Sequence, residues 1–275
     1  MAITDSDIAF LINEVRRAGE ADIMPRFRNL AAGDIAEKTS AIDLVTQADL
    51  QAEERITRSL RQRFPQALIV GEEAYEMDRS VVPALNDAAL AFVIDPVDGT
   101  YNFASGLPMF GTILAVVANG ETVAGIIHDP ILGDTITAVI GGGAHLQRAN
   151  GSSSRLQVGA AKPLAAMTGI VAWAHMDEPD RSRIAANMAK IRMSFYYNCS
   201  AYEYWMLGCG RIDFVAQQKI NPWDHLAGLL IHREAGGYSA RYDGQPHRPG
   251  EMEGGILAAP DRDSWETIRQ DIIGH

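Results

Sequence analysis

The stretch Ile94–Thr100, with the sequence IDPVDGT, decides how the rest of the chain is organised. It continues the apolar run 89–94, which is short, partly β-branched and followed by a Pro/Gly turn signal. Such a run predicts a buried strand. Pro96 lacks a backbone N–H, so we expect the hydrogen-bonded ladder of this strand to end before it.

Two carboxylates and a glycine stand where this strand ends. Asp95 and Asp98 lie three positions apart, and Gly99 lets the backbone come close to a ligand. Thr100 can open a helix whose free N–H groups attract an anion. The pattern is typical of a site that offers oxygens to a hard cation and amides to a phosphate. An Asx turn followed by a capped helix would explain the same residues.

The composition is that of an ordinary soluble globular protein with one large domain or two modest ones. The chain has 275 residues, 47% hydrophobic and 21% charged, and a formal net charge of -11. This charge argues against a broad surface for nucleic acid or anionic membranes. Because Cys199 and Cys209 are too few for a disulfide framework, we expect reduced thiols and a cytoplasmic location. Residues 1–30 lack a signal-peptide core, and no apolar run is long enough to span a membrane.

The first part of the chain predicts an α+β arrangement. We expect a helix capped by Thr4, Asp5 or Ser6, a hairpin or loop over 37–49, a helix over 50–64 and a strand over 67–70. Strand-like runs at 110–118, 122–128 and 135–140 are joined by short turn sequences, which predicts an antiparallel meander. Because 150–154 is rich in Gly and Ser, we expect it to be flexible and place a subdomain boundary near Ser154.

The second part has a different pattern of elements, in which short strands alternate with helices. We expect strands at 169–173, 212–216 and 255–258, and helices at 179–191, 201–210, 224–235 and 261–273. This alternation predicts a mixed α/β layer. The predicted division is therefore an α+β subdomain over 1–154, with an antiparallel sheet, and an α/β subdomain over 155–275.

Acidic residues recur where a strand or loop meets the next element. They are Asp49, Glu72 with Glu73, Asp95 with Asp98, and Asp224. Oxygen ligands alone favour Mg²⁺, Mn²⁺ or Ca²⁺, and no Cys/His spacing typical of zinc is present. Structural roles would also fit, because Asp224 can be the third residue of a helix opened by Asn221 and Glu72-Glu73 can be a solvated turn.

Taken together, these positions resemble the signature blocks of the inositol monophosphatase family. The blocks are Asp43–Asp49, Val70–Glu73, Asp95–Phe103, Pro222–Gly228 and Arg233–Gly237. Their order and rough spacing also fit, and the resemblance covers nearly the whole chain. It implies a layered α-β-α-β-α sandwich of the sugar-phosphatase type, dependence on Mg²⁺ and hydrolysis of a phosphomonoester.

The resemblance also implies a set of metal ligands. Glu72, Asp95 and the backbone carbonyl of Val97 would hold a first Mg²⁺. Asp95, Asp98 and Asp224 would hold a second. Glu72 with waters would hold a third, weaker ion, so two or three ions are expected, with Mn²⁺ as a possible substitute and Li⁺ as an inhibitor. This agrees with the chemistry, because cations neutralise the phosphate oxygens and lower the pKa of an attacking water.

Further roles follow from the same resemblance. Thr100, paired with Asp49, would orient the nucleophilic water. The amides of Gly99 and Thr100 would bind the phosphate, and Glu73 would orient Glu72 or a metal-bound water. Lys38 fits either a place near the site or a solvated surface. The resemblance further implies a homodimer.

The substrate is less closely defined. Family members that hydrolyse inositol phosphates carry a Glu seven positions before the last metal Asp, and here that position is Gln217. The amide of Ser200 would approach the substrate, which Asp98 and Asp224 would also contact. Inositol monophosphate is the first expectation. Histidinol phosphate, fructose 1,6-bisphosphate and 3′-phosphoadenosine 5′-phosphate are alternatives, since relatives acting on them share the metal motifs.

Two rival functions remain open at this point. A phosphoaspartate mechanism would need an Asp-x-Asp signature, whereas the spacing here is Asp-x-x-Asp. A non-enzymatic regulatory partner could retain the phosphatase fold, although every expected metal-ligand position keeps its carboxylate. We assign packing or surface roles to His128, His225 and His232, and we expect Cys199 to be a small apolar filler.

Overall fold

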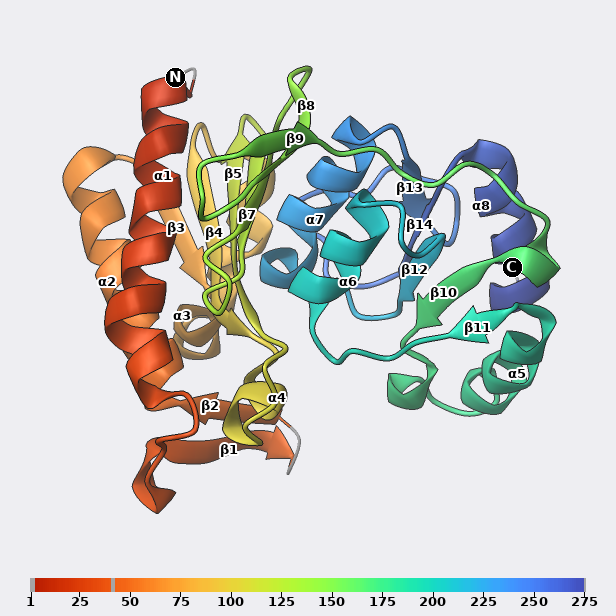
Figure 1. Ribbon diagram of the computed structural model, residues 1–275, viewed down its shortest axis with the longest axis horizontal. Coiled ribbons are helices and arrows are strands. Elements are labelled where there is room, and N and C mark those ends of the chain that lie inside the picture. The colour runs from red at the N-terminus through yellow and green to blue at the C-terminus, as the bar shows by residue number, and fades with distance from the viewer. Residues whose placement is uncertain (1–2, 41–42, 275) are drawn as a thin grey trace.

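The computed structural model describes residues 3–40 and 43–274, and these form five stacked layers (Figure 1). A pair of helices lies at one end, followed by a large sheet, a second helix pair, a small sheet and an outer helix pair. The helices are α1 (Asp5–Ala18) and α2 (Gln47–Arg63), then α6 (Ser200–Gly208) and α7 (Pro222–Glu234), then α5 (Asp180–Asn187) and α8 (Arg262–Ile268). The layered α-β-α-β-α prediction is confirmed.

The large sheet contains seven strands within the described residues, in sequence order from β3 to β9. They are β3 (Leu68–Gly71), β4 (Ala91–Asp98), β5 (Gly111–Ala118), β6 (Glu121–His128), β7 (Thr135–Val139), β8 (Gly143–Gln147) and β9 (Ser153–Arg155). Among the described strand pairs of this sheet only β3–β4 is parallel, so the predicted antiparallel meander is confirmed. The flexible segment expected at 150–154 instead leads into β9, which pairs with β8.

Strand β4 continues past Pro96, and the expectation that it ends before this residue is wrong. Asp95 pairs with Ile113, and Asp98 pairs with Gly111 after a shift of register. The two residues between them leave the ladder as a bulge, because Pro96 has no N–H to donate. The carbonyl of Pro96 accepts a hydrogen bond from the Thr112 hydroxyl at 2.8 Å instead. The bulge thus keeps both aspartates on one strand end.

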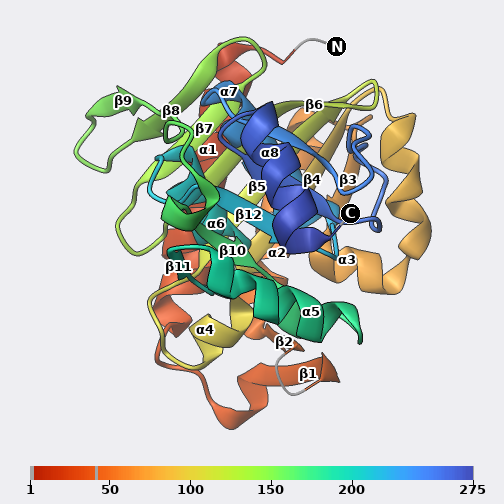
Figure 2. The same cartoon turned by 90° about the vertical axis from the view of Figure 1, so that its right-hand side faces the viewer.

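The small sheet is mixed, as expected for the second part of the chain. Its order is β11-β10-β12-β14-β13, with parallel pairs around β10 and antiparallel pairs around β14. The strands are β10 (Thr168–Val171), β11 (Met193–Ser194), β12 (Phe214–Gln217), β13 (Tyr238–Arg241) and β14 (Ile256–Ala259). Helices α5 and α8 cover the outer face of this sheet (Figure 2).

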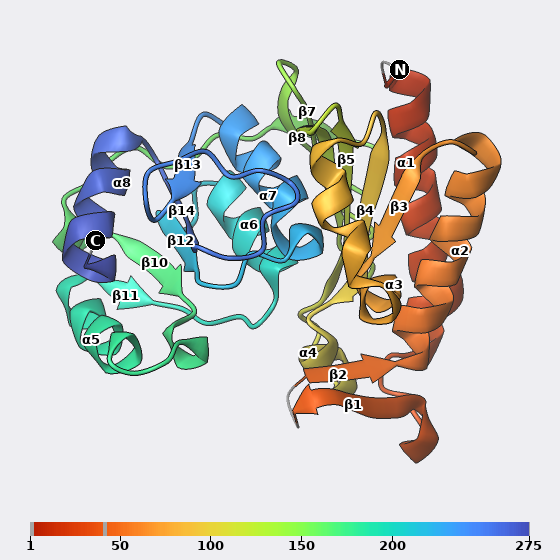
Figure 3. The ribbon, with the colours of Figure 1, turned by 180° about the vertical axis from the view of Figure 1, so that it is seen from behind.

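Alternation along the strands divides the apolar side chains between the layers. On β4, Phe92 and Ile94 pack toward α1 and α2, while Val93 packs toward α6 and α7. Helix α7 is buried along almost its whole length, since it lies between two sheets (Figure 3). A third apolar cluster, which includes Phe214 and Trp265, joins the small sheet to α8. Each helix layer therefore buries apolar surface against a sheet, which is the main source of stability.

A small hairpin stands beside these layers and reaches the large sheet through short helices. It consists of β1 (Ile35–Ser40) and β2 (Asp43–Thr46). Ala41 and Ile42, which belong to the hairpin or loop expected over 37–49, lie outside the described residues. Helices α3 (Glu72–Met77) and α4 (Thr100–Ala104) follow β3 and β4. The predicted cap of α1 is Thr4, which forms a reciprocal capping box with Asp7. The subdomain boundary near Ser154 stays a prediction.

Candidate functional site

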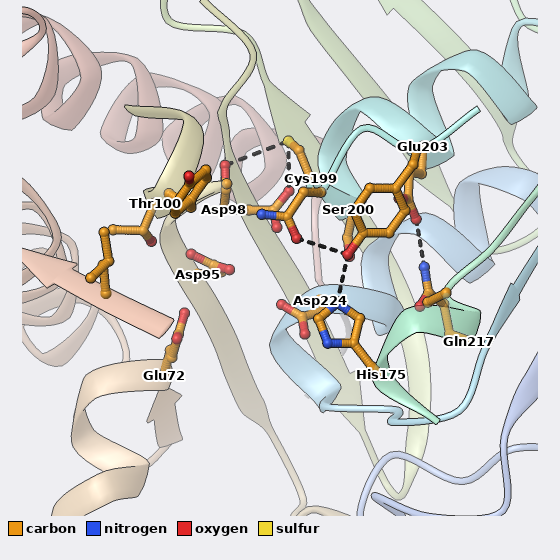
Figure 4. A pocket seen from close by; sticks show the side chains of 16 residues that line it. Glu72, Asp95, Asp98, Thr100, His175, Cys199, Ser200, Glu203, Gln217 and Asp224 are labelled. Carbon is orange, nitrogen blue, oxygen red and sulfur yellow. Dashed lines mark hydrogen bonds between the residues drawn. The ribbon is translucent and has the colours of Figure 1, made fainter. Parts of the chain in front are cut away.

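Three carboxylates from two distant parts of the chain meet beside the end of β4. One oxygen each from Asp95, Asp98 and Asp224 lies within 4.8 Å of the others. Asp95 and Asp98 are 2% and 7% exposed, and Asp224 is half-buried at the first turn of α7. Figure 4 shows these side chains lining a single pocket. Such a group of carboxylate oxygens suits a hard divalent cation.

The helix start that the sequence allowed is present, with Asn221 as the N-cap and Asp224 in the first turn, but Asp224 also joins the other two aspartates, so its role is not purely structural. In the described structure no side chain caps the start of α7, and the carboxylate of Asp224 accepts a hydrogen bond from the Asn221 side chain at 3.0 Å. Pro222 begins the helix with a fixed φ and no N–H to satisfy. The helix start thus directs Asp224 toward the other two aspartates.

The electrostatics of this cluster also favour a bound cation. Burial, and next the negative charge of Glu72, raise the pKa of Asp95 well above its usual range. Burial and the charge of Asp98 do the same to the pKa of Asp224. Burial raises the pKa of Asp98 to about 6, although the N–H of Ala201 stabilises its charged form at 2.5 Å. Divalent cations would relieve this mutual repulsion.

Glu72 and Glu73 form an ion-paired group with Lys38, so the solvated-turn alternative is wrong. The ammonium of Lys38 lies 2.8 Å from Glu72 and 2.5 Å from Glu73, and its side chain is only 11% exposed. Burial lowers the pKa of Lys38, but the charges of both glutamates outweigh burial and raise it. Burial and the charge of Glu72 raise the pKa of Glu73 to about 7. Lys38 therefore lies beside the site, which answers a question that the sequence left open.

Glu53 is a residue of this region that the sequence did not reveal. Its carboxylate accepts the backbone N–H groups of Glu73 and Ala74 at 3.0 and 3.1 Å, and so holds the first turn of α3. A Cβ at Gly71 would lie 2.2 Å from the carboxylate carbon of Glu53. Gly71 thus lets α2 approach the end of β3.

Thr100 and Asp49 are brought together as expected. The hydroxyl of Thr100 lies 3.2 Å from the carboxylate of Asp49 and 2.9 Å from the carbonyl of Val97. Asp49 also accepts the backbone N–H of Thr46 at the start of α2, at 2.8 Å. Burial raises the pKa of Asp49 to about 7. Gly99 has φ of +88°, which allows the sharp turn from β4 into α4.

The pocket has a volume of about 190 Å³ and brings together most of the predicted site residues. Glu72, Asp95, Asp98, Gly99, Thr100, Ser200, Gln217 and Asp224 all line it. Asp49, Val97 and Glu73 are not among the residues that line the pocket. Cys199 lines the pocket as well, and its thiol donates to Asp98 at 3.0 Å, so the expectation of a purely apolar filler is wrong.

The end of the pocket farthest from Glu72 holds a carboxylate that the sequence analysis missed. Glu203, on α6, accepts a hydrogen bond from the Gln217 side-chain amide at 2.6 Å (Figure 4). Burial, together with the charge of Asp98, raises the pKa of Glu203 to about 8. The available signal was a single carboxylate within the otherwise uncharged stretch Ser200–Gly208. Its direction toward the pocket depends on packing that no local pattern encodes.

Three buried histidines lie outside the pocket lining. The His128 ring contacts the carbonyl of Asp134 at 3.0 Å, and the His225 ring contacts the Tyr204 hydroxyl at 3.1 Å. His232 is enclosed, with Gly237 packed against its ring. Burial lowers the pKa of His128 and His232 to about 4 and that of His225 to about 3. All three are therefore packing residues.

A five-layered α/β fold with a buried carboxylate cluster between its sheets defines a protein of the sugar-phosphatase class. The chain belongs to the inositol monophosphatase family, whose sequence profile matches residues 4–273. The predicted family is thereby confirmed, and with it the expectation of a phosphoric monoester hydrolase.

Individual relatives carry several names. A fructose-1,6-bisphosphatase/inositol-1-monophosphatase of Thermotoga maritima is 33% identical over 215 residues, which cover 77% of this chain and 77% of the relative. A protein of Escherichia coli (strain K12) named Nus factor SuhB is 31% identical over 236 residues, which cover 85% and 84%. The crystal structure of the extragenic suppressor protein suhB from Bartonella henselae is 25% identical with a TM-score of 0.79, and 98% of each chain is covered.

No helix within residues 3–40 and 43–274 has the length and apolar character needed to cross a membrane.

Proposed function

We propose that this protein is a Mg²⁺-dependent phosphomonoesterase that hydrolyses a small phosphorylated metabolite by attack of water. The observation that carries the proposal is the meeting of Asp95, Asp98 and Asp224 in a pocket, with carboxyl pKa values raised by burial and mutual repulsion. A dianionic phosphate could not approach these groups without cations to neutralise them. The donor set consists of carboxylate oxygens, which fits Mg²⁺ and also Mn²⁺.

The family resemblance supplies the residues that would hold the ions, and all of them except Val97 line the pocket. Glu72, Asp95 and the carbonyl of Val97 would form one set, and Asp95, Asp98 and Asp224 the other, with a third ion near Glu72. Bound Mg²⁺ would neutralise the phosphate oxygens and lower the pKa of the attacking water. Occupation near Glu72 would compete with Lys38, which pairs with the same carboxylate at 2.8 Å. We expect Li⁺ to inhibit by displacing one of these ions.

The chain itself would orient the reactants. The Thr100 hydroxyl contacts Asp49 at 3.2 Å, so this pair can hold a water and accept its proton. The amides of Gly99 and Thr100 would bind the phosphate. Glu73, paired with Lys38 at 2.5 Å, would fix the direction of Glu72.

On the alcohol side, we propose contacts from Asp98, Ser200, Gln217 and Asp224, all of which line the pocket. Inositol monophosphate is the first candidate substrate. Histidinol phosphate, fructose 1,6-bisphosphate and 3′-phosphoadenosine 5′-phosphate are the alternatives. We further propose that the protein acts as a homodimer in the cytoplasm.

The test is phosphate release with and without Mg²⁺ from these four compounds and NADP. Hydrolysis of one of them with kcat/KM above about 10⁴ M⁻¹s⁻¹ would support the proposal and identify the substrate. Feeble turnover of all would place the substrate outside the panel. No cleavage despite bound Mg²⁺ would favour a regulatory role. This alternative is suggested by the relative that is named Nus factor SuhB. Isolation of a phosphoaspartate at Asp95 would overturn the proposed attack by water.

A further inference from the structure

The pocket has two chemically different ends. Glu72, Asp95 and Thr100 stand at one end, and Glu203 and Gln217 stand at the other (Figure 4). If the phosphate is bound among the first group, the alcohol that leaves must extend toward the second. The chemistry of that second end therefore bears on which alcohol is accepted.

Glu203 is a carboxylate buried without a cation. It is 2% exposed, and the amide of Gln217 is the one side chain that the described structure gives it as a hydrogen-bond partner. Taking a carboxylate out of water is costly unless a positive charge or several hydrogen bonds compensate. Within the described pocket lining there is no lysine or arginine. A ligand that brings a positive charge would compensate Glu203 and favour its ionised form.

Gln217 adds a second acceptor to the same end. Its amide nitrogen donates to Glu203 at 2.6 Å, which directs its carbonyl oxygen away from that bond. A carboxylate oxygen and an amide oxygen are then available to a group that donates hydrogen bonds. Tyr196, His175 and Asn198 complete the rim, but the tyrosine hydroxyl is already engaged with His175 at 2.5 Å and Asn198 at 3.2 Å.

We propose that Glu203, supported by Gln217, binds a cationic nitrogen on the leaving alcohol, so that the preferred substrate is the phosphate monoester of an amino alcohol. The inference rests on the proposed phosphomonoesterase function and narrows its substrate class. Among the candidates above, it places histidinol phosphate, whose alcohol carries an amine, ahead of inositol monophosphate and the bisphosphates. Water adds to phosphorus, the ester P–O bond breaks, and the alcohol leaves with a proton taken from that water. Glu203 takes part only in binding. A second phosphate on the substrate would meet Glu203 with like charge and is disfavoured.

The experiment compares matched substrates in the presence of Mg²⁺. The probes are alkyl phosphates of two to five carbons that carry a terminal amine, a terminal hydroxyl or a second phosphate, with para-nitrophenyl phosphate as a reference. At the best chain length we expect kcat/KM for the amine to exceed that for the hydroxyl by about tenfold or more, as for a charge-assisted hydrogen bond. The bisphosphate should be the poorest substrate.

The variant Glu203→Gln keeps the shape and removes the charge. We expect the ratio of the amine to the hydroxyl substrate to fall to about one. The control is Glu14→Gln, a buried glutamate that pairs with Arg17 on α1 outside the pocket, and it should keep both the ratio and the activity. Competition by free amino alcohols and by the matching diols on the wild type repeats the comparison without a variant.

The outcomes distinguish a failure of the amino-alcohol preference from a failure of the proposed phosphomonoesterase function. Hydrolysis of para-nitrophenyl phosphate with no preference for the amine, or a preference that survives in Glu203→Gln, would overturn this inference and leave the proposed function intact. Failure to release phosphate from any compound, para-nitrophenyl phosphate included, would overturn the proposed function and the inference with it.

Discussion

Asp95 belongs to the carboxylate cluster, and its ionised form is disfavoured in the metal-free protein. Burial, Glu72, Asp98 and Asp224 all raise its pKa. The same arrangement that would make it a shared ligand for cations therefore makes it destabilising without them.

We predict that Asp95→Asn lowers the rate of Mg²⁺-dependent phosphate release by more than about a hundredfold. Loss of a metal ligand should cost more than loss of a residue that only hydrogen-bonds to a ligand. In a chelator, its melting temperature should equal or exceed that of the wild type, since a repelling charge is gone. The exposed Asp243→Asn, which can keep its hydrogen bond to the Gln245 N–H, is the control. An Asp95→Asn enzyme with normal activity and Mg²⁺ dependence would contradict the proposed ligand set.

Site residues that belong to a contiguous sequence motif could be predicted from the sequence, whereas site residues outside such motifs could not. Asp95, Asp98 and Gly99 could be named because they share one strand end. Glu53 and Glu203 could not, because their contacts join segments 20 and 14 positions apart. A lone carboxylate in an apolar helix is ambiguous until the helix is placed beside a pocket.

At the level of elements, the β1–β2 hairpin depends on Lys38 for its polar contact with the site. We predict that Lys38→Met lowers the free energy of unfolding of the metal-free protein by about 2 kcal/mol, because two partly buried carboxylates lose their cation. Mg²⁺ should restore part of this loss by binding at Glu72. Denaturant titrations with and without Mg²⁺ provide the measurement. An equal loss in both conditions would contradict the competition between Lys38 and the metal.

The contact between α6 and α7 requires a residue without a side chain. A Cβ at Gly228 would lie 2.1 Å from the Tyr204 ring. We predict that Gly228→Ala lowers the free energy of unfolding by about 1–3 kcal/mol through overpacking, despite the better helix propensity of alanine. Gly33→Ala, whose Cβ would have no neighbour within 4 Å, should be neutral. Equal thermal stability of the two variants would show that the helices can separate without cost.

Elements with strong periodicity were predicted well, and those that depend on pairing were not. The meander followed from alternating runs and short turns. Strand β4 was placed too short because Pro96 reads as a terminator, whereas Asp98 resumes pairing with Gly111 beyond the bulge. Strands β9 and β11 have three and two residues and form only against neighbours that are already in place.

At the scale of the whole molecule, buried ionisable groups should make stability depend on pH. The pKa values of Asp49 and Glu73 are raised to about 7 and that of Glu203 to about 8. The native state therefore binds more protons than the unfolded state, and stability falls as pH rises through these values. The buried histidines, with pKa lowered to about 4 or below, act in the opposite direction, but only below pH of about 6.5.

We therefore predict that the free energy of unfolding of the metal-free protein falls between about pH 6.5 and pH 8.5. The slope should be about 1 kcal/mol per pH unit for each proton that the native state binds in excess of the unfolded state. Urea denaturation in a chelator at several pH values provides the measurement. Saturating Mg²⁺ should weaken or reverse the trend, because a cation binds the ionised carboxylates. Stability that rises with pH in the chelator would contradict the assignment of these groups.

Different elements of the fold carry the carboxylate cluster and the outer end of the pocket. The carboxylates around β4 come from the large sheet and α7, whereas Glu203 and Gln217 come from α6 and β12. Mutations on α6 or β12 can alter the outer end of the pocket while the shared aspartates stay in place. A duplicated gene could thus acquire a new substrate through a few such changes and inherit its chemistry intact, which is one route by which a single ancestral scaffold could diversify.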